Sequence, residues 1–395
     1  MMKKWEIKKE NTDKVKEISE KYKLTKIVAT ILLNRNIIEE EAIRKFLTPT
    51  RNDFYNPFLI TDMEKAVNRI ISAIEQKENV TIYGDYDVDG ITSTAVLKMF
   101  LEERGMKCNI YIPNRLEEGY GLNNGAVDKI KDTGSTLIIT VDCGITANKE
   151  IEYAQKLGIE TIVTDHHEPK ETIPNAYAVI DNKRKDSTYP FRELAGVGVV
   201  FKVAQAISKK LNLPAEEYLK YLDIVCVGTI SDIVPLVDEN RVITKLGMML
   251  VKQTRNLGLR ELISKSGYKK VDSTAVSFAI APRINASGRM GLATTALNLL
   301  LSKNTKEANE LADLLNKYNK DRQDEEKKIF KEAVEQIEKE GLADNKTIVV
   351  AHENWHHGVI GIVSSKITEK YFKPSILLGI EGDLCKGSRK KYSRI

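Results

Sequence analysis

Between residues 80 and 164 the sequence alternates regularly between short β-branched apolar runs and longer stretches with helical periodicity. The apolar runs are VTIY (80–83), CNIYIP (108–113), TLIITV (136–141) and ETIVT (160–164), and the helical stretches cover residues 92–105, 123–134 and 147–158. Strands that alternate with helices pair in parallel, because each helix carries the chain back to the starting edge of the sheet. The pattern therefore predicts an α/β fold, with a parallel sheet covered by helices on both faces.

The rest of the chain predicts a division into four parts, since 395 residues exceed what one core usually organises. We expect an N-terminal helical segment (1–75), the parallel-sheet domain (76–240), a helical connector (241–340) and a second α/β domain (341–395). Within the connector, residues 240–267 and 316–340 are predicted as helices. The segment APRINASGRMG (281–291) is predicted as a glycine-punctuated loop.

Composition excludes several classes of protein. No apolar run is long enough to cross a bilayer, and the N-terminal lysines are not followed by the apolar stretch of a secretion signal. We therefore expect a cytoplasmic protein without a membrane partner. The four cysteines form no CxxC pair, which disfavours a zinc ribbon and a disulfide framework. A net charge of +5 permits a nucleic-acid partner without requiring one.

Acidic side chains and histidines follow three of the predicted strands. Asp85, Asp87 and Asp89 occupy alternate positions after the first strand, so they share one side if the backbone stays extended. Asp142 follows the strand 136–141, and Asp165-His166-His167 follows the strand 160–164. Ligands of such sheets bind outside the carboxyl ends of the strands. We therefore expect these side chains to meet on one rim.

Three other interpretations of the acidic run deserve weight. An isolated Asp after a strand is commonly the N-cap of the next helix. A calcium-binding EF-hand loop fails, because its twelfth position would be Val96 instead of a bidentate Glu, and because the run follows a strand. A phosphoaspartyl transferase of the haloacid dehalogenase type would leave His166 and His167 unexplained.

The acids and histidines together favour a cation site. If Asp87, Asp89, Asp142 and Asp232 lie about 5 Å apart, each like-charged pair repels by roughly 3 kcal/mol at an effective dielectric near 20. Carboxylate oxygens with imidazole nitrogen suit Mn²⁺ or Mg²⁺, and two such ions about 3.5–4 Å apart are a standard device for phosphodiester hydrolysis. For the pair His356-His357, a ligand role and a helix-starting role both remain open.

The motifs carry a family resemblance. DYDVDG, VDCG, TDHH and GTISDIVPL, in this order and spacing, resemble the four motifs of the DHH phosphoesterase superfamily. EGYGLN, LAGVGVVFK, APRINASGRMG and HHGVIGIVSSKI make the sequence most similar to the RecJ family of single-strand-specific 5′ to 3′ DNA exonucleases, from about residue 50 to about 387. The resemblance implies a DHH domain, a helical connector and a DHH-associated domain.

The resemblance also implies roles for individual residues. A pair of Mn²⁺ or Mg²⁺ ions would be held by Asp87, Asp89, Asp142, His166 and Asp232, with Asp142 as the bridge. His167 would lie beside the ions and the scissile phosphate, Asp165 would orient the histidines, and Asp85 would do likewise or act as a cap. The substrate contacts would be Arg115, Tyr120, Arg283, Ser388 and Arg389. For Tyr120, stacking on a base and packing in a core are both open.

The activity implied by the resemblance is hydrolysis of single-stranded DNA to nucleotides from the 5′ end by a two-metal mechanism without a side-chain nucleophile. DNA repair and recombination would be its setting, with a helicase or a single-strand-binding protein as candidate partners. The oligomeric state cannot be predicted. Two alternatives stay open: a phosphodiesterase of short oligonucleotides or cyclic dinucleotides from the same superfamily, and a non-catalytic nucleic-acid-binding scaffold.

The sequence departs from the family pattern after LLGIEGDLCKGS. Relatives continue with Gly-Arg-Ser and later add an oligonucleotide-binding barrel, whereas this sequence reads RKKYSRI and ends. We therefore expect an incomplete second domain without the barrel, in which Ser388 and Arg389 are doubtful equivalents of the family's phosphate contacts. We also expect weak or distributive action on long strands, because each stacked base contributes about 1–3 kcal/mol to binding.

Overall fold

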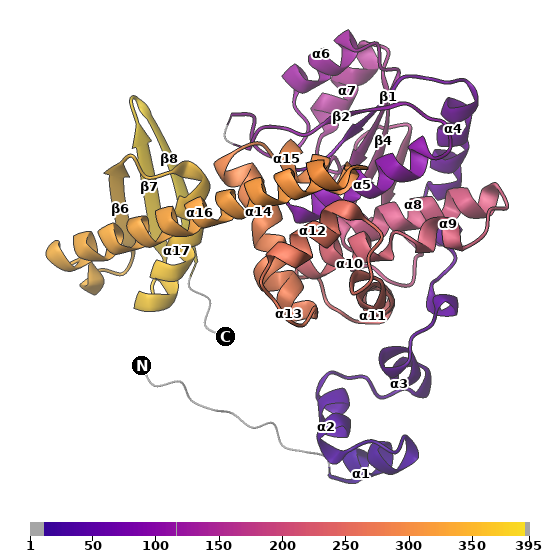
Figure 1. Ribbon diagram of the computed structural model, residues 1–395, viewed down its shortest axis with the longest axis horizontal. Helices are drawn as coiled ribbons and strands as arrows, with labels where there is room; N and C mark the ends of the chain where they lie inside the picture. The colour runs from indigo at the N-terminus through magenta and orange to yellow at the C-terminus, as the bar shows by residue number, and fades with distance from the viewer. Residues whose placement is uncertain (1–11, 116, 392–395) are drawn as a thin grey trace.

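The computed structural model describes residues 12–115 and 117–391, which form a larger lobe around one sheet and a smaller lobe around a second sheet (Figure 1). The first eleven residues and the last four, at the two ends of the predicted parts, lie outside the described residues. The segment before the first sheet is helical, as predicted: α1 (Thr12–Lys21), α2 (Lys26–Asn34), α3 (Glu40–Leu47), the short η1 (Arg51–Asp53) and η2 (Pro57–Leu59), and α4 (Met63–Glu75). The helices α1 to α3 have a small apolar core of their own.

Five parallel strands form the sheet of the larger lobe in the order β2-β1-β3-β4-β5. The strands are β1 (Val80–Tyr83), β2 (Cys108–Tyr111), β3 (Leu137–Val141), β4 (Glu160–Asp165) and β5 (Ala178–Asp181). The helices are α5 (Val88–Glu102), α6 (Asn124–Asp132), α7 (Asn148–Lys156), α8 (Gly196–Lys210), α9 (Glu216–Leu219) and α10 (Leu222–Ser231). This confirms the predicted α/β class. The fifth strand was not predicted.

Helices cover both faces of this sheet, which explains why its central strands are apolar throughout. Ile82 and Ile139 face the core formed with α5 and α8, whereas Ile138 and Val163 face the core formed with α6 and α7. The strand order reverses between β1 and β3, so the chain leaves these neighbouring strands in opposite directions and opens a crevice at their carboxyl ends. The predicted rim of acids and histidines lies at this crevice.

The segment after the sheet is helical, and here one prediction was wrong. Its elements are α11 (Asp238–Val251), α12 (Leu257–Lys265), α13 (Ser273–Ala275), the π-helical turn η3 (Val276–Ile280), α14 (Ala281–Met290), α15 (Thr294–Leu301) and α16 (Thr305–Lys339), followed by the short η4 (Leu342–Asp344). Residues 281–290, predicted as a loop, form α14. Its glycine serves packing: a Cβ on Gly288 would lie 3.0 Å from the backbone oxygen of Tyr86.

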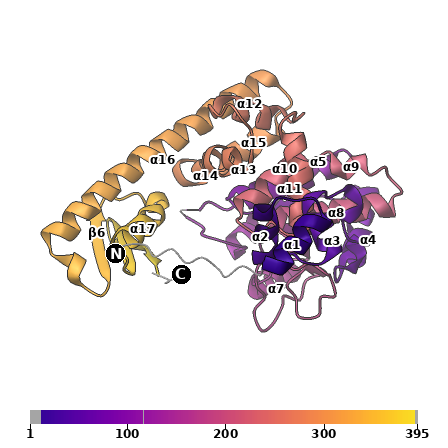
Figure 2. The same cartoon turned by 90° about the horizontal axis from the view of Figure 1, so that it is seen from below.

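A single helix joins the two lobes. The predicted helix 316–340 is α16, which begins earlier, at Thr305, because Ala308, Ala312 and Leu315 pack its first turns into the core of the larger lobe. Seen from below, α16 runs as one rod from the larger lobe to the smaller one (Figure 2). Among the described residues, no helix has both the length and the apolar character needed to span a membrane.

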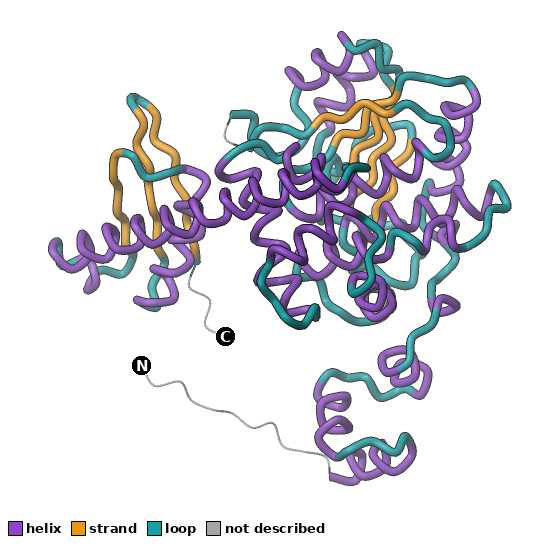
Figure 3. The backbone as a smooth tube through the Cα atoms, viewed as in Figure 1, coloured by secondary structure: helices purple, strands orange, loops and turns teal. Residues whose placement is uncertain are grey.

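The smaller lobe contains the second group of strands in Figure 3. Its elements are β6 (Ile348–Glu353), α17 (His357–Tyr371), β7 (Ser375–Glu381) and β8 (Leu384–Lys390), with the sheet order β6-β7-β8. The pair β6-β7 is parallel and the pair β7-β8 is antiparallel. The buried side of this sheet packs against α16 and α17 around Trp355 and Leu377.

Candidate metal centre and phosphate-binding residues

The sequence suggested that the acids after β1 lie on an extended chain, but the structure shows that the helix α5 begins within this run. The strand ends at Tyr83, and α5 begins at Val88, so Asp87 is the N-cap and Asp89 lies in the first helical turn. Asp87 accepts a 3.1 Å hydrogen bond from the Gly90 N–H. The N-cap interpretation and the cation-site interpretation therefore both apply to Asp87.

Asp89 is fixed by the next helix over the sheet. Its two carboxylate oxygens accept hydrogen bonds from the backbone N–H groups of Gly196 (2.6 Å) and Val197 (2.9 Å) at the N-terminus of α8. A helix N-terminus favours a negative charge, so this contact stabilises a carboxylate that is only 2% exposed. The carboxyl group of Asp89 is thus held in one orientation inside the protein.

Asp142 leaves β3 in the left-handed region, with φ of 59°. The strand register sets it beside Asp165, because Val141 pairs with Thr164. One oxygen of Asp142 lies 3.1 Å from Nε2 of His166, yet neither atom has hydrogen-bonding geometry to any partner in the described chain. Two buried ligand-type atoms that approach without bonding are typical of a cation site.

Asp165 organises the two histidines that follow it. Its Oδ1 accepts a hydrogen bond from the backbone N–H of His166 (2.7 Å) and lies 2.7 Å from Nδ1 of His167, while Oδ2 accepts from the Ile145 N–H (2.9 Å). Burial opposes the charge of Asp165, but the bond with His167 outweighs it and lowers the pKa of this carboxyl group. The hydroxyl of Tyr120 donates to the backbone oxygen of Asp142 at 3.2 Å and lies 3.2 Å from His167. Tyr120 is 51% exposed, so it is not a core residue, and its hydroxyl is held at the site.

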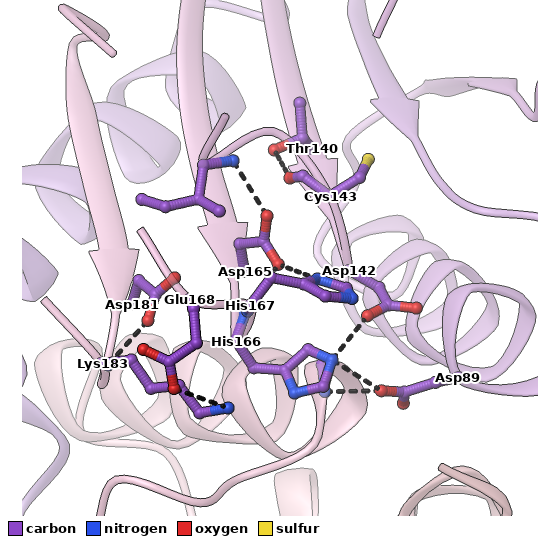
Figure 4. A network of polar contacts seen from close by, with 12 residues as sticks. Asp89, Thr140, Asp142, Cys143, Asp165, His166, His167, Glu168, Asp181 and Lys183 are labelled. Atoms are coloured by element: carbon purple, nitrogen blue, oxygen red, sulfur yellow. Dashed lines mark hydrogen bonds and ion pairs between the residues drawn. The ribbon is translucent and has the colours of Figure 1, made fainter. Parts of the chain in front are cut away.

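His166 points into the cluster of carboxylates (Figure 4). Its Nε2 lies 3.8 Å from Asp89 and 3.7 Å from Asp232, which caps the C-terminus of α10. Three groups of ligand atoms form here, each within 4.8 Å: Asp85, Asp87 and Asp142; Asp89, His166 and Asp232; and Asp142, His166 and His167. Asp142 and His166 each belong to two of these groups, so the groups adjoin and share residues.

The raised pKa values of the carboxyl groups in the cluster indicate that the protein alone does not neutralise their negative charge. Burial and then the charge of Asp87 raise the pKa values of Asp85 and Asp89 to about 7, and burial and then Asp89 raise that of Asp232 to about 7. Burial and the charge of Asp89 also raise the pKa of Asp142 well above its usual value. Oδ1 of Asp85 has no hydrogen-bond partner in the described chain. Divalent cations bound by oxygen and imidazole ligands fit this set.

Gly196 is a part of the site that the sequence interpretation missed. A Cβ at this position would lie 2.7 Å from Oδ1 and 2.8 Å from Cβ of Asp142. The missing side chain therefore allows the N-terminus of α8 to approach both Asp89 and Asp142. The available signal was the Gly-Val-Gly of LAGVGVVFK.

Three arginines gather beside the cluster. The guanidinium of Arg115 lies 4.7 Å from the centre of the Tyr86 ring. Burial, with the nearby charges of Arg115 and Arg322, lowers the pKa of Arg289 to about 10, and Arg289 donates a 2.8 Å hydrogen bond to the backbone oxygen of Gly358 in the smaller lobe. Sequence interpretation missed Arg289, although it lies in the same motif as Arg283.

Arg283, the predicted phosphate contact, is engaged elsewhere. It donates to the side chain of Asn316 (2.6 Å) and to the backbone oxygen of Ala279 (2.8 Å). The structure thus brings Arg115 toward the acidic loop but ties Arg283 to the long helix.

The N-terminus of α17 faces Arg289. His356 caps this helix by accepting a 3.1 Å hydrogen bond from the Gly358 N–H, which settles its helix-starting role. Ser388 lies beside Gly361, since a Cβ there would come within 3.2 Å of its hydroxyl. Arg389 pairs with Ile376, whereas Ser388 pairs with the buried Leu377. Alternate residues of a strand face opposite sides, so Arg389 points away from α17.

Comparisons with known proteins agree with this fold and site. Residues 79–229 match the family model described as "DHH family, N-terminal domain". The fold and the cluster at the carboxyl edge of its sheet therefore define a DHH-domain protein. The Single-stranded-DNA-specific exonuclease RecJ of Bacillus subtilis (strain 168) is 44% identical over 390 residues, which are 98% of this chain and 49% of that protein.

Solved structures extend the similarity. A structure described as exonuclease RecJ bound to manganese is 35% identical, covers 85% of this chain and 83% of its own, and has a TM-score of 0.77. RecJ in complex with Mn²⁺ from Thermus thermophilus is 31% identical, covers 98% of this chain and 55% of its own, and has a TM-score of 0.82. The chain belongs to the RecJ family, and it spans about half the length of the Bacillus relative.

Proposed function

We propose that this protein is a metal-dependent exonuclease that hydrolyses single-stranded DNA to nucleotides from the 5′ end. The observation that carries the proposal is the buried cluster at the carboxyl ends of β1, β3 and β4. Its acids and histidines form groups in which the ligand atoms all lie within 4.8 Å of one another. Relatives named as single-stranded-DNA-specific exonucleases, and a related structure bound to manganese, support it. In this proposal residues 76–240 are the catalytic domain, 241–340 connect, and 341–395 bind the substrate.

Two Mn²⁺ or Mg²⁺ ions would be held by Asp87, Asp89, Asp142, His166 and Asp232, with Asp142 shared between them. Asp85 joins this set, because its unpaired oxygen belongs to the same group as Asp87 and Asp142. When bound, such ions acidify water and stabilise the charge that develops on a phosphodiester during hydrolysis.

The protein's own groups would orient the reacting parts. Asp165 holds His167 through a 2.7 Å contact to Nδ1, and the Tyr120 hydroxyl lies 3.2 Å from the same nitrogen, so the ring has a fixed orientation beside the cluster. We propose that His167 contacts the scissile phosphate. Asp165 and Tyr120 are positioning residues in this arrangement.

The substrate would enter between the lobes. Arg115 and Arg289 bring positive charge next to Tyr86, and arginine pairs with phosphate oxygens through its planar fork. Arg322 lies near Arg289 but is paired with Glu326 at 2.5 Å. The N-terminus of α17 adds the positive end of a helix, which favours an anion, and the Ser388 hydroxyl lies beside Gly361 of this helix. We propose that this surface receives the phosphates next to the scissile bond, in place of Arg283.

The deciding experiment compares the release of label from the 5′ end and from the 3′ end of a single strand. A single strand labelled at the 5′ end and another labelled at the 3′ end are incubated with the protein and Mn²⁺, beside EDTA and an Asp89→Ala control. Early release of the 5′ label as a mononucleotide, lost in both controls, is expected. Equal absence of cleavage with and without Mn²⁺ would instead favour a binding scaffold, and cleavage restricted to very short strands would favour an oligonucleotide phosphodiesterase.

The cellular setting is also a proposal. We propose repair and recombination in the cytoplasm, with a helicase or a single-strand-binding protein supplying the single strand, as a setting in which a single-strand-specific exonuclease such as the named relatives could act. A pull-down with purified candidates on a gapped DNA would test the partners.

A comparison of the two arginines of α14 tests the substrate surface. Arg289→Ala is expected to raise the KM for a single strand about tenfold, because a hydrogen bond between charged groups contributes about 1.5–3 kcal/mol, and to reduce the salt slope of binding by about one. Arg283→Ala should leave the salt slope unchanged. Fluorescence anisotropy across a salt series measures this slope. The reverse result would return the phosphate contact to Arg283.

A second comparison uses Ser388 and Arg389, whose side chains lie on opposite sides of β8. Ser388→Ala is expected to reduce the preference for a 5′-phosphorylated end about fivefold, the effect of a hydrogen bond of about 1 kcal/mol. Arg389→Ala should change it less than about twofold, because Arg389 lies on the opposite side of the strand. Competition between 5′-phosphate and 5′-hydroxyl strands gives the ratio. A larger effect of Arg389 would place its side chain at the substrate.

A further inference from the structure

A cavity of about 760 Å³ lies away from the metal centre. It is bounded by the last turns of α5, the first turns of α10 and the end of α15, through Met99, Ile224 and Leu301 among others. The metal-site acids of these helices are at their opposite ends, since Asp89 is in the first turn of α5 and Asp232 follows the last turn of α10. With 15 residues, α5 separates the cavity from the cluster by about 20 Å.

The walls of the cavity are mostly apolar, with one unsatisfied donor. Leu250, Leu257 and Leu300 contribute to them. Tyr221 also lines the cavity and is only 6% exposed, yet its hydroxyl has no partner with hydrogen-bonding geometry within the described residues. Burial, then the charge of nearby Glu103 and its side-chain contact with the hydroxyl, raise the pKa of Tyr221, so the hydroxyl keeps its proton. The contact with Glu103 lacks hydrogen-bonding geometry, so the proton can be donated to a ligand. A buried hydroxyl without a partner costs free energy that a ligand's acceptor atom would recover.

The charges around the cavity are unevenly satisfied. Each acidic side chain of the lining has a partner: Glu102 with Lys98 (2.6 Å), Glu103 with Lys220 (2.6 Å), Glu216 with Arg51 (3.3 Å) and Asp223 with the Thr254 hydroxyl (2.5 Å). Arg255 and Lys303 also line the cavity, and neither forms an ion pair with any described carboxylate. Three of the four lining carboxylates are thus paired with cations and Asp223 only with a hydroxyl, so Arg255 and Lys303 leave a surplus of one positive charge beside the apolar walls.

We propose that this cavity is a binding site for a nucleoside monophosphate, separate from the metal centre. The volume suits a ligand of that size. The base packs against the apolar walls and accepts a hydrogen bond from Tyr221, while Arg255 and Lys303 bind the phosphate. The choice of a nucleotide among anionic molecules rests on the proposed function, because mononucleotides are what that hydrolysis releases. The site provides a second place where product binds.

The test measures binding, so it does not depend on hydrolysis. Deoxyadenosine 5′-monophosphate is titrated by calorimetry into the full chain in EDTA. Saturable binding is expected, with a Kd raised at least tenfold in the double variant Arg255→Ala/Lys303→Ala and several-fold in Tyr221→Phe. The matched control Lys252→Ala/Lys306→Ala removes two exposed cations that do not line the cavity, and its Kd should equal that of the wild type.

The substrate surface supplies the remaining comparison. Arg289→Ala should leave the Kd of the cavity unchanged, because Arg289 does not line it, and should weaken only a second, separate binding event at the substrate surface. Absence of saturable binding in the wild type would overturn the proposal. Equal losses in the cavity double variant and in its matched control would show non-specific attraction, and loss in Arg289→Ala alone would assign the nucleotide to the substrate surface. Failure of the exonuclease assay would leave the binding result intact, so the two proposals fail separately.

Discussion

Asp142→Asn is expected to lower the rate of metal-dependent hydrolysis of a single strand on the order of 10³-fold, because electrostatic stabilisation is usually the largest contribution to such catalysis. Asp142 is shared by two groups of ligand atoms, so asparagine removes a charge that serves both cation positions. The substitution keeps the shape of the side chain. Release of a labelled mononucleotide with Mn²⁺ measures the rate.

The same variant is expected to unfold at a higher temperature than the wild type in EDTA. Asp142 lies among Asp85, Asp87, Asp89 and Asp165, whose charges oppose its own. A like-charged pair at about 4 Å repels by about 4 kcal/mol at an effective dielectric near 20, so at a pH above the raised pKa of Asp142 the removal of its charge relieves the folded state. Calorimetry measures the unfolding temperatures of both proteins in EDTA and in Mn²⁺. In Mn²⁺ the wild type should unfold at the higher temperature, since it gains more stability from bound ions. A variant that is less stable in EDTA would contradict this view of the cluster.

Gly196→Ala should disable the site without touching a ligand. The added methyl group would lie 2.7 Å from Oδ1 of Asp142, and the Gly196 N–H also holds Asp89 at 2.6 Å. Neither side can yield easily, because Gly196 begins a buried helix and Asp142 is fixed in a left-handed turn. We expect a loss of activity on the order of 10²-fold, and a loss of stability of about 1–3 kcal/mol from overpacking.

The matched control is Gly125→Ala on α6. Its Cβ would meet only the Asn123 side chain, at an ordinary 3.5 Å. Alanine is favoured over glycine within a helix by up to about 1 kcal/mol, so this variant should be as active as the wild type and slightly more stable. Denaturant unfolding and the strand-end assay compare both variants. Full activity of Gly196→Ala would show that α8 moves freely relative to Asp142.

The sheet and its functional edge could be predicted because both depend on short stretches of sequence. VTIY and TLIITV are β-branched and apolar, and helices separate the strands, so parallel pairing followed. The position of ligands at the carboxyl ends is a property of such sheets. These two arguments were sufficient to place Asp142 beside Asp165, which the register of β3 and β4 confirms.

Other features depend on contacts between distant segments and were hidden from the sequence. α14 was predicted as a loop because its glycine and proline resemble turn signals, whereas Gly288 serves the close approach to Tyr86. Sequence interpretation named Arg283 and not Arg289, because only the packing of α14 against α17 brings Arg289 into contact with the smaller lobe. The fixed orientation of Tyr120 depends on His167, which is 47 residues away in the sequence.

The long helix α16 determines how far the two lobes separate when one rotates relative to the other. Its 35 residues make a rod of about 52 Å, so a rotation of about 5° at one end swings the other by about 4–5 Å. Any such swing away from α14 must break the hydrogen bond between Arg289 and Gly358. The two lobes are thus joined by α16 and also held together by the hydrogen bond between Arg289 and Gly358. A bond of a few kcal/mol can open by thermal motion, so the gap between the lobes can widen without unfolding of either lobe.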